Sequence, residues 1–453
     1  MNLLTLTESY ISKKLSPKES VELCLRNIKD HSAYNAFITI CEEEALEAAC
    51  IAEKEISKGN VKGPLHGVPV AIKDVIFTDG IRTTMGSKVY TDFVPNFDAT
   101  AVQKLKAAGA IIIGKANTHE FAYGPTGDRS LIGPCRNPYN PNKITGGSSS
   151  GSAVAVSKNM AYAALGTDTG GSIRIPAAAC GVVGMKPTFG LVSKYGAYNT
   201  AYTLDHIGPM TKTVKDNAAM LNVLVGYDEK DPHSLHKSKE DYTRFIGQSI
   251  TGKKIGLPSY YFKNINQEVS KAIEEVIKIY QDFGAIFKEV EIQAIEDIAK
   301  FQAITIQAET YAVHELNIRT RGSDYDEEVF ERLQSSQNLP AYKYVLAQQK
   351  RMELTNRYNE VFTNIDVLLT PTLPILPTDI NQREVMIGDY SEPVRSAVLR
   401  LTAPTNYTGN PGMSIPCGLS KTGLPIGFQL IGKHRSEAIL YQIGDAYEQQ
   451  IRN

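Results

Sequence analysis

The hydrophobic pattern of the N-terminal part of the chain predicts two helices. Residues 16–30 (SPKESVELCLRNIKD) place apolar positions three and four apart, and they open with a capping box that has proline at the first helical position. A second helix is predicted at about 42–58, where a glycine follows.

The apolar run GVPVAIKD (67–74) predicts a buried strand, because it is short and almost free of polar residues. It places Lys73 near the C-terminal end of that strand. Farther along, 99–108 predicts a helix and 110–114 a strand, so helices and strands follow each other in turn. This alternation favours an α/β fold over separate all-α and all-β units.

The remainder of the chain continues the mixture. Residues 136–147 form a loop rich in proline and asparagine, 230–250 predict a polar surface connection, and 266–362 are mostly helical in pattern. The other predicted elements are a strand and loop at 253–261, strands at 365–370, 414–418 and 426–432 and a closing helix at about 436–450. No internal repeat, low-complexity tract or clean linker divides the sequence, so we expect one large domain.

Composition is that of an ordinary globular protein. The 453 residues are 42% hydrophobic and 21% charged, and the net charge is −1. A balance this close to neutral provides no basic stripe, so direct nucleic-acid binding is not expected. The six cysteines lack CxxC spacing, which argues against a disulfide framework and favours a reducing cytoplasm. No apolar run reaches the roughly 18 residues of a membrane span.

Two Gly/Ser clusters, GGSSSGS (146–152) and DTGGS (168–172), flank a stretch of small apolar residues. Glycine carries an entropic cost and is used where the backbone needs a positive φ or a close approach. The clusters therefore predict a surface of backbone N–H groups and serine hydroxyls, which acyl transfer requires. The apolar run at 153–156 predicts a helix packed on the core and, with the run at 161–165, argues against a flexible linker.

These motifs resemble the amidase signature hydrolases, in which a segment like GVPVAIKD precedes stretches like GGSSSGSA and GTDTGGSIRIPA. The resemblance extends from about residue 16 to the C-terminus. It implies a Ser–Ser–Lys triad with Ser172 as nucleophile, Ser148 as the bridging serine at a typically cis peptide bond, and Lys73 as base. Burial of the lysine should lower its pKa, because a low-dielectric environment disfavours the charged form, and a neutral amine can then accept protons near neutral pH.

The resemblance also implies the surroundings of the triad. The backbone N–H groups of the oxyanion hole are expected at Thr169, Gly170 and Gly171. The residues expected to hold the loops are Ser152, Asp168 and Arg174.

The implied fold class is α/β, a single large domain whose mixed, twisted central sheet is covered by helices on both faces. Residues 1–453 then form one amidase signature domain with three parts, an N-terminal helical part (1–60), a catalytic core (61–230) and a variable substrate-side half (250–453).

The resulting hypothesis is a cytoplasmic amide-bond hydrolase that forms an acyl-enzyme on Ser172 and acts on a small carboxamide or aryl amide. No metal or other cofactor is expected. The expected partner is the small-molecule amide substrate, together with either a second copy in a homodimer or partner subunits, and neither a nucleic acid nor a membrane. The acyl and amine parts of the substrate are left open.

One branch of the family provides an alternative. The segments ACGVVGMKPTFG and LDHIGPM are similar to those of glutaminase A subunits of glutamyl-tRNA(Gln) amidotransferase, which supply ammonia to a partner subunit. Those subunits bind glutamine through an arginine, for which Arg332 could stand, and through an aspartate. Leu399 occupies the position of that aspartate, and Asp389 and Glu392 are acids near it. Because leucine cannot hold an ammonium group, we favour a stand-alone amidase.

Other chemistry is less well supported. Residues 147–151 spell G-S-S-S-G, which fits the nucleophile elbow of α/β-hydrolases at Ser149, but a loop stands where the elbow needs a strand. His66, His119 and Glu120 lack metal-ligand spacing, and DTGGS lacks the G-K-[ST] ending of a P-loop. A purely structural assembly protein would have no need for the lysine and both serines.

Overall fold

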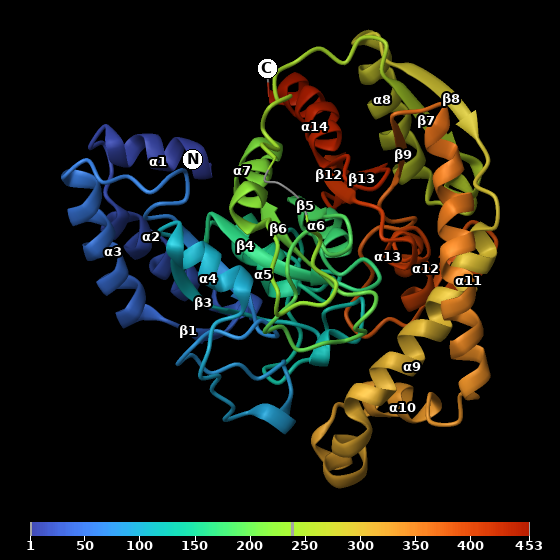
Figure 1. Ribbon diagram of the computed structural model, residues 1–453, viewed down its shortest axis with the longest axis horizontal. Coiled ribbons are helices and arrows are strands. Elements are labelled where there is room, and N and C mark those ends of the chain that lie inside the picture. Colours follow the sequence, from blue (N-terminus) through green and yellow to red (C-terminus); the bar gives the residue numbers. More distant parts are fainter. Residues whose placement is uncertain (1, 237–239, 453) are drawn as a thin grey trace.

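The computed structural model describes residues 2–236 and 240–452, so three residues of the predicted connection, 237–239, lie outside the described residues (Figure 1). An eleven-stranded sheet runs through the described part of the chain. In spatial order its strands are β1 (Phe37–Ile40), β3 (Ile111–Ala116), β2 (Pro69–Lys73), β4 (Ala163–Asp168), β6 (His206–Thr211), β5 (Val183–Lys186), β12 (Gly412–Leu419), β13 (Pro425–Gly432), β9 (Val367–Pro371), β7 (Lys254–Pro258) and β8 (Ile286–Val290). A separate two-stranded sheet pairs β10 (Glu384–Ile387) with β11 (Tyr390–Pro393).

Strand directions in the large sheet are mixed, as predicted. Strand β2 is parallel to β3 and β4, and β7 is parallel to β8 and β9, while the other neighbours are antiparallel. The first six strands in spatial order all come from residues 37–211, and the other five come from 254–432. The two groups meet where β5 pairs with β12 and Lys186 lies opposite Gly412.

Helices cover both faces of this sheet. They are α1 (Leu3–Ile11), α2 (Pro17–Asp30), α3 (Glu42–Ser57), α4 (Thr100–Ala107), α5 (Ser150–Ser157), α6 (Arg174–Cys180), α7 (Val214–Leu224), α8 (Gln267–Asp282), α9 (Ile295–Arg321), α10 (Glu327–Ser335), α11 (Ala341–Asn359), α12 (Val394–Arg400), α13 (Pro404–Thr408) and α14 (Glu437–Arg452).

Strand β12 shows how the two faces are filled. A Cβ on Gly412 would touch the Arg174 side chain of α6, whereas the next residue, Met413, reaches Gly444 of α14. Because successive side chains of a strand point to opposite faces, α6 and α14 lie on opposite sides of the sheet. In Figure 1 the helices α1–α3 lie at one end of the molecule, and α9 and α11 lie at the other.

Several predicted elements are confirmed within one to three residues. Helix α2 has Ser16 as N-cap with the capping box and the proline, and α3 ends one residue before the predicted end. The predicted strands recur as β2, β3, β7, β9, β12 and β13, and the predicted helices as α4, α5 and α14. One difference lies within 266–362, where strand β8 separates the predicted helices. Every residue of β8 is exposed or half-buried at the sheet edge, so the segment lacks the buried apolar run that would predict a strand.

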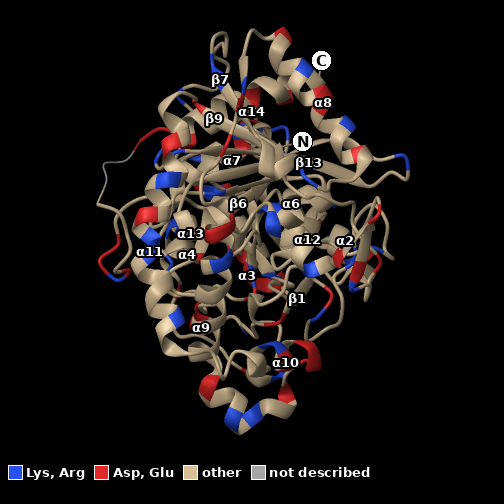
Figure 2. Cartoon of the chain, turned by 90° about the vertical axis from the view of Figure 1, so that its right-hand side faces the viewer, with Lys and Arg blue, Asp and Glu red and all other residues tan. Residues whose placement is uncertain are grey.

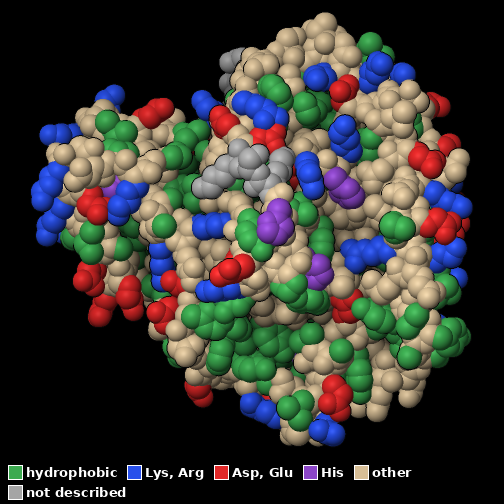
Figure 3. All heavy atoms as spheres, viewed as in Figure 1, with side chains coloured by type: hydrophobic (Ala, Val, Ile, Leu, Met, Phe, Trp, Pro, Cys, Tyr) green, Lys and Arg blue, Asp and Glu red, His purple; other side chains and the backbone are tan. Residues whose placement is uncertain are grey.

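The surface mixes side-chain types. Lys and Arg alternate with Asp and Glu over the helices seen in Figure 2. Figure 3 shows hydrophobic side chains gathered in the lower half of the face drawn there. Within the described residues, none of the helices combines the length and the apolarity that crossing a bilayer requires.

Candidate active site

Lys73 is the last residue of β2, a strand buried between β3 and β4. Its side chain is fully buried, and its Nζ lies 2.7 Å from Ser148 Oγ and 2.7 Å from Thr167 Oγ1. Burial lowers the pKa of Lys73 to about 7, although the nearby carboxylates of Asp168 and Asp205 act in the opposite direction. The amine is therefore neutral in a large fraction of molecules near pH 7.

Ser148 is presented by the loop that leads into α5. The peptide bond between Gly147 and Ser148 is cis, as the resemblance implies. The Gly147 N–H donates to the Pro125 carbonyl at 2.6 Å, and the His119 N–H donates to the Ser148 carbonyl at 3.1 Å. The segment 119–125 thus holds the bridging serine in place.

Ser149 is engaged with the backbone of β4. Its Oγ donates to the Thr167 carbonyl at 3.1 Å and accepts the Thr167 N–H at 3.2 Å. Its own N–H donates to the Ser172 carbonyl at 3.1 Å, which ties the two Gly/Ser loops together. A serine hydroxyl occupied in this way is a structural group, and the structure therefore argues against a nucleophile elbow at Ser149.

The second Gly/Ser loop follows β4 and is organised by Asp168. This carboxylate accepts the N–H groups of Gly171 at 2.8 Å and of Ile173 at 3.2 Å. It also pairs with Arg174, whose Nη2 lies 3.0 Å from Oδ1 and whose Nε lies 3.1 Å from Oδ2, and it accepts Nδ2 of Asn406 at 2.8 Å. Burial raises the pKa of Asp168, but Arg174 more than offsets this, so the pKa stays well below its usual range.

The predicted oxyanion-hole residues lie on the same loop. The Gly171 N–H is donated to Asp168, whereas the N–H groups of Thr169 and Gly170 have no acceptor within the described part of the chain. The hydroxyl of Thr402 donates to the Gly170 carbonyl at 2.7 Å and packs where a Cβ on Gly171 would lie. Of the three predicted oxyanion-hole residues, Thr169 and Gly170 thus have N–H groups that are available to a substrate oxygen.

Ser172 lies at the end of this loop, 6% exposed, and only Ile173, the N-cap, separates it from α6. The predicted support residue Ser152 lies on α5, and its hydroxyl donates to the Leu165 carbonyl of β4 at 2.9 Å. This bond fixes α5 to the strand from which the Ser172 loop emerges.

Four residues of this site were not predicted from the sequence. They are Thr167, Asp205, Thr402 and Asn406. Asp205 accepts the Thr169 hydroxyl at 2.6 Å, and its burial raises its pKa to about 6. Thr167 stands inside the GTDTGGS motif and Asp205 inside the LDHIGPM segment, so their places in these segments were usable signals, whereas Thr402 and Asn406 act from a distant part of the chain.

The residues considered for a metal have other partners. His66 lies 2.9 Å from Glu55, His119 Nδ1 accepts the Gly127 N–H at 3.2 Å, and Glu120 accepts the Asp326 N–H at 2.9 Å. Within the residues that the structure describes, no group of three or more histidine, cysteine, aspartate or glutamate side chains is placed to hold a metal ion.

The four residues that were compared with a glutamine-binding site each have a different position and different contacts. A Cβ on Gly170 would lie 3.2 Å from Leu399, so this leucine does face the catalytic loop. Arg332 Nη1 donates to the Tyr123 carbonyl at 2.5 Å. Asp389 is exposed in the turn between β10 and β11, and Glu392 pairs with Arg400 at 3.3 Å.

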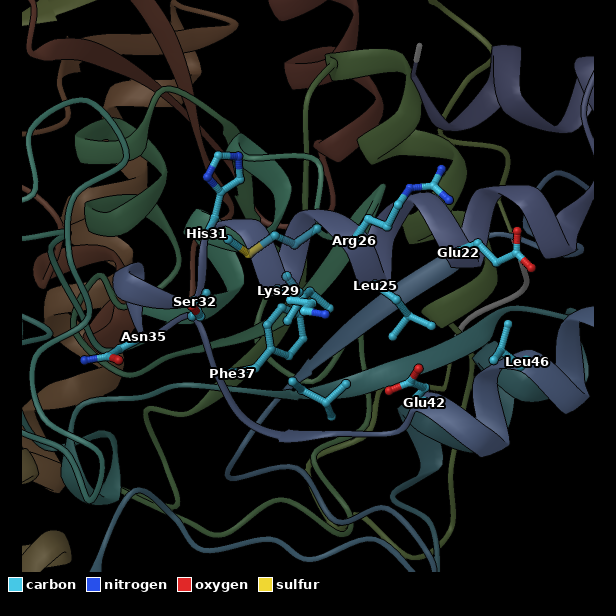
Figure 4. Close-up of a pocket in the computed structure, with 14 residues that line it drawn as sticks. Glu22, Leu25, Arg26, Lys29, His31, Ser32, Asn35, Phe37, Glu42 and Leu46 are labelled. Atoms are coloured by element: carbon cyan, nitrogen blue, oxygen red, sulfur yellow. The ribbon is translucent and has the colours of Figure 1, made fainter.

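A large cavity lies away from this site. It has a volume of about 840 Å³ and lies between α2, β1 and the start of α3, with residues such as Leu25, Phe37 and Leu46 on its wall (Figure 4). Neither the triad nor any other predicted site residue lines it. The cavity is therefore separate from the candidate active site.

Comparison with known proteins gives matches over almost the whole chain. The sequence model of the Amidase family matches residues 19–440. The A subunit of glutamyl-tRNA(Gln) amidotransferase from Alkaliphilus metalliredigens is 39% identical, over 100% of this chain and 96% of its own length.

Two solved structures extend the comparison. One, described as a vestigial protein complex that reveals the evolutionary origins of an s-triazine catabolic enzyme, has a TM-score of 0.96 at 30% identity, with 99% and 98% of the two chains covered. A bacterial aryl acylamidase of the amidase signature family has a TM-score of 0.90 at 28% identity, with 99% and 96% covered.

Proposed function

Since the chain belongs to the amidase signature family, we propose that it breaks an amide C–N bond through an acyl-enzyme on Ser172. The observation that carries this proposal is the contact of 2.7 Å between the buried Lys73 Nζ and Ser148 Oγ. A lysine with a pKa of about 7, beside a serine and next to a loop in which the Thr169 and Gly170 N–H groups have no acceptor among the described residues, has the parts that acyl transfer needs.

The contacts of Lys73 suit proton transfer from Ser148. A neutral amine has two N–H donors and one lone pair. The Thr167 hydroxyl and carbonyl oxygens lie 2.7 and 3.5 Å from Nζ and can accept the two N–H groups, which leaves the lone pair for the Ser148 proton. Ser148 in turn accepts the proton of Ser172 as the Ser172 oxygen attacks the amide carbon.

The next steps use the same groups in reverse. The N–H groups of Thr169 and Gly170 stabilise the negative oxygen of the tetrahedral intermediate. Ser148 then returns a proton to the amide nitrogen, which leaves as an amine, because an unprotonated amide nitrogen is a poor leaving group. Water hydrolyses the acyl-enzyme and releases the acid.

Labelling tests the nucleophile directly. A fluorophosphonate probe should label the wild type and fail to label Ser172→Ala. Ser149→Ala serves as the matched control, since that hydroxyl is bound to the β4 backbone. Loss of labelling in Ser149→Ala together with normal labelling of Ser172→Ala would refute the assignment.

A second candidate is the glutaminase component of an amidotransferase. The full-length identity of 39% with a protein of that name favours this role over the stand-alone amidase that the sequence alone suggested, whereas Leu399 beside Gly170 counts against glutamine as the substrate. Glutamine release is the specific activity to measure, with the chain alone and with partner subunits and glutamyl-tRNA added. Glutaminase activity that requires those additions would establish the amidotransferase role, and hydrolysis of other amides by the isolated chain would exclude it as the sole activity.

A further inference from the structure

The region around Tyr123 holds four arginines, and three of them form ion pairs. The ion pairs there join Arg129 to Asp326 and Glu328, Arg332 to Glu328, and Arg383 to Asp128 and Glu328. Three arginines thus share three carboxylates. Arg395 is a fourth cation, and it has no carboxylate at ion-pair distance among the described residues.

Arg395 lies in the first turn of α12 and faces Tyr123. Its Cζ is 5.9 Å from the centroid of the Tyr123 ring, and Cζ of Arg332 is 5.4 Å from the same ring. Nε of Arg395 and the hydroxyl of Tyr123 are both buried without a hydrogen-bond partner. Burial and the charge of Arg332 lower the pKa of Arg395, although a guanidinium stays protonated at any ordinary pH. Buried polar atoms without partners are rare in proteins and call for an explanation.

The position of Arg395 relative to the catalytic loops follows from its neighbours. Tyr123 precedes Gly124, whose carbonyl lies 2.8 Å from where a Cβ on Gly147 would stand, next to Ser148. At the other end of α12, Leu399 packs on Gly170. Arg395 and Leu399 are four residues apart and share one face of the helix. The helix therefore extends from the Ser148 loop to the proposed oxyanion loop with Arg395 and Leu399 on the same side.

We propose that Arg395 binds a carboxylate of the substrate, so that the enzyme acts on amides whose acyl chain ends in a carboxylate. The inference rests on the proposed acyl-enzyme chemistry at Ser172. Arginine binds carboxylates through charge-assisted hydrogen bonds, which would satisfy the buried Nε. Arg332 is already engaged by Glu328 and by the Tyr123 carbonyl, whereas Nε of Arg395 has no hydrogen-bond acceptor among the described residues.

The same surroundings disfavour an amino group on that acyl chain. Leu399 faces the loop and cannot pair with an ammonium group, and the charge of Arg395, which has no ion-pair partner among the described residues, would repel one. An acyl chain with unsubstituted methylenes, as in glutaramate, needs no partner for an ammonium group beside Leu399.

The test compares three ligands that differ by one group each. Glutaramate is glutamine without its amino group, and valeramide is glutaramate with a methyl group in place of the carboxylate. Isothermal titration calorimetry on the Ser172→Ala variant measures their binding without turnover. We expect glutaramate to bind about tenfold to a hundredfold more tightly than valeramide, the range of a charge-assisted hydrogen bond, and more tightly than glutamine.

Variants on the same helix assign the effect to its residue. In the Ser172→Ala background, Arg395→Met should lose about tenfold or more of the glutaramate affinity, and Arg395→Lys should lose less because it keeps the charge. Arg400→Met removes a charge of the same type from α12 and should leave the glutaramate affinity unchanged, because Arg400 pairs with Glu392. The preference for glutaramate over valeramide is measured with Arg395 in place. It therefore still tests the inference if Arg395→Met does not fold.

The outcomes separate this inference from the function beneath it. Equal affinity for valeramide and glutaramate, tighter binding of glutamine, or no measurable binding of glutaramate would overturn the carboxylate inference. Any of these results together with normal fluorophosphonate labelling of Ser172 would leave the acyl-enzyme proposal standing. Failure of that labelling would refute the proposed function itself, whatever glutaramate does.

Discussion

The amine of Lys73 has its basicity set by the residues around it. A lysine in water has a pKa near 10.4 and is charged at neutral pH. Burial at the end of β2 lowers the pKa to about 7, and the two hydroxyl contacts hold the amine toward Ser148. One side chain is thereby both oriented and made a base by burial and two hydrogen bonds.

The first prediction is the pH dependence of turnover. Because the neutral amine is the active form, kcat/KM for an amide substrate should rise with pH and level off above about 7. The shift is downward from the usual value, so the active form is lost as pH falls through about 7. A kcat/KM that rises only near pH 10 would show that the pKa of Lys73 is not lowered, and a flat profile would remove it as the base.

The second prediction is that Lys73→Ala loses activity but keeps the fold. Loss of a general base lowers kcat by about 10²–10⁴-fold. Lys350→Ala is the matched control, because its amine pairs with Glu353 at the surface and should leave kcat unchanged. Circular dichroism and the melting temperature report on the fold. A variant at position 73 with near-normal kcat would take the lysine out of the mechanism.

Sequence motifs located the residues of this site that belong to the motifs themselves. Lys73, Ser148 and Asp168 lie in conspicuous segments and make the contacts described above. Asn406 and Thr402 touch the same loop from more than 230 residues away, and no local pattern encodes such a contact. Arg395 was missed for a related reason. It differs from the neighbouring arginines because they pair with carboxylates and, among the described residues, it does not, and no local pattern shows this.

At the scale of elements, the loop after β4 depends on a buried ion pair. Asp168 and Arg174 are both fully buried, and Arg174 also donates to Thr405 and Asn406 of α13. These bonds connect the loop, α6 and α13. The geometry of Ser172 thus depends on a helix from the C-terminal part of the chain.

The third prediction concerns that pair. Asp168→Asn leaves the Arg174 guanidinium buried without its counter-charge, and removing one partner of a buried pair typically costs about 3–5 kcal/mol. Urea unfolding measures this loss. The exposed pair of Glu315 and Arg319 provides the control, since Glu315→Gln should change the free energy of unfolding little. Equal effects of the two substitutions would contradict the assigned role of Asp168.

The fourth prediction concerns Gly171. Its φ is +134°, which side chains rarely adopt, and a Cβ there would lie 2.1 Å from Oγ1 of Thr402. Gly171→Ala should displace the loop and lower kcat by about a hundredfold or more, comparable to loss of an oxyanion donor. Gly247 also has a positive φ but has open space around it, so Gly247→Ala should keep full activity. Normal activity of Gly171→Ala would show that the loop tolerates the shift.

Elements with strong local signals were predicted well, and those without were not. The capping box and proline fixed the start of α2 to the residue. Strand β6 contains glycine and proline, which normally argue against a strand, yet it pairs along its whole length with β4. Its formation is decided by neighbouring strands, which no local pattern reveals.

At the scale of the whole molecule, α1 belongs to the main core. Leu3 and Leu6 are fully buried in it, and the N–H groups of Leu3 and Leu4 donate to Asp216 of α7 at 3.2 and 3.1 Å. The N-terminal segment is thereby attached to a helix more than 200 residues away. Helix α1 is nine residues long and has a single capping signal, so its sequence gave no indication that it attaches to α7.

The fifth prediction tests that attachment. Leu6→Ala should lower the free energy of unfolding by about 2–5 kcal/mol, because it leaves a cavity in the core. Leu316 on α9 is 59% exposed, and Leu316→Ala should have almost no effect. Denaturant titration of the two variants compares the same chemical change at a buried and an exposed site. Similar midpoints for both would show that α1 adds nothing to the stability of the core.

The order of strands in the large sheet also governs how the protein is made. During synthesis, β5 has only β6 beside it until β12 leaves the ribosome, since β12 begins at residue 412. The nascent chain carries Lys73, Ser148 and Ser172 long before Thr402 and Asn406 exist to hold the Ser172 loop. A ribosome stalled before residue 400 therefore carries an open strand edge at β5 and all three residues of the proposed triad, without the contacts that hold the Ser172 loop.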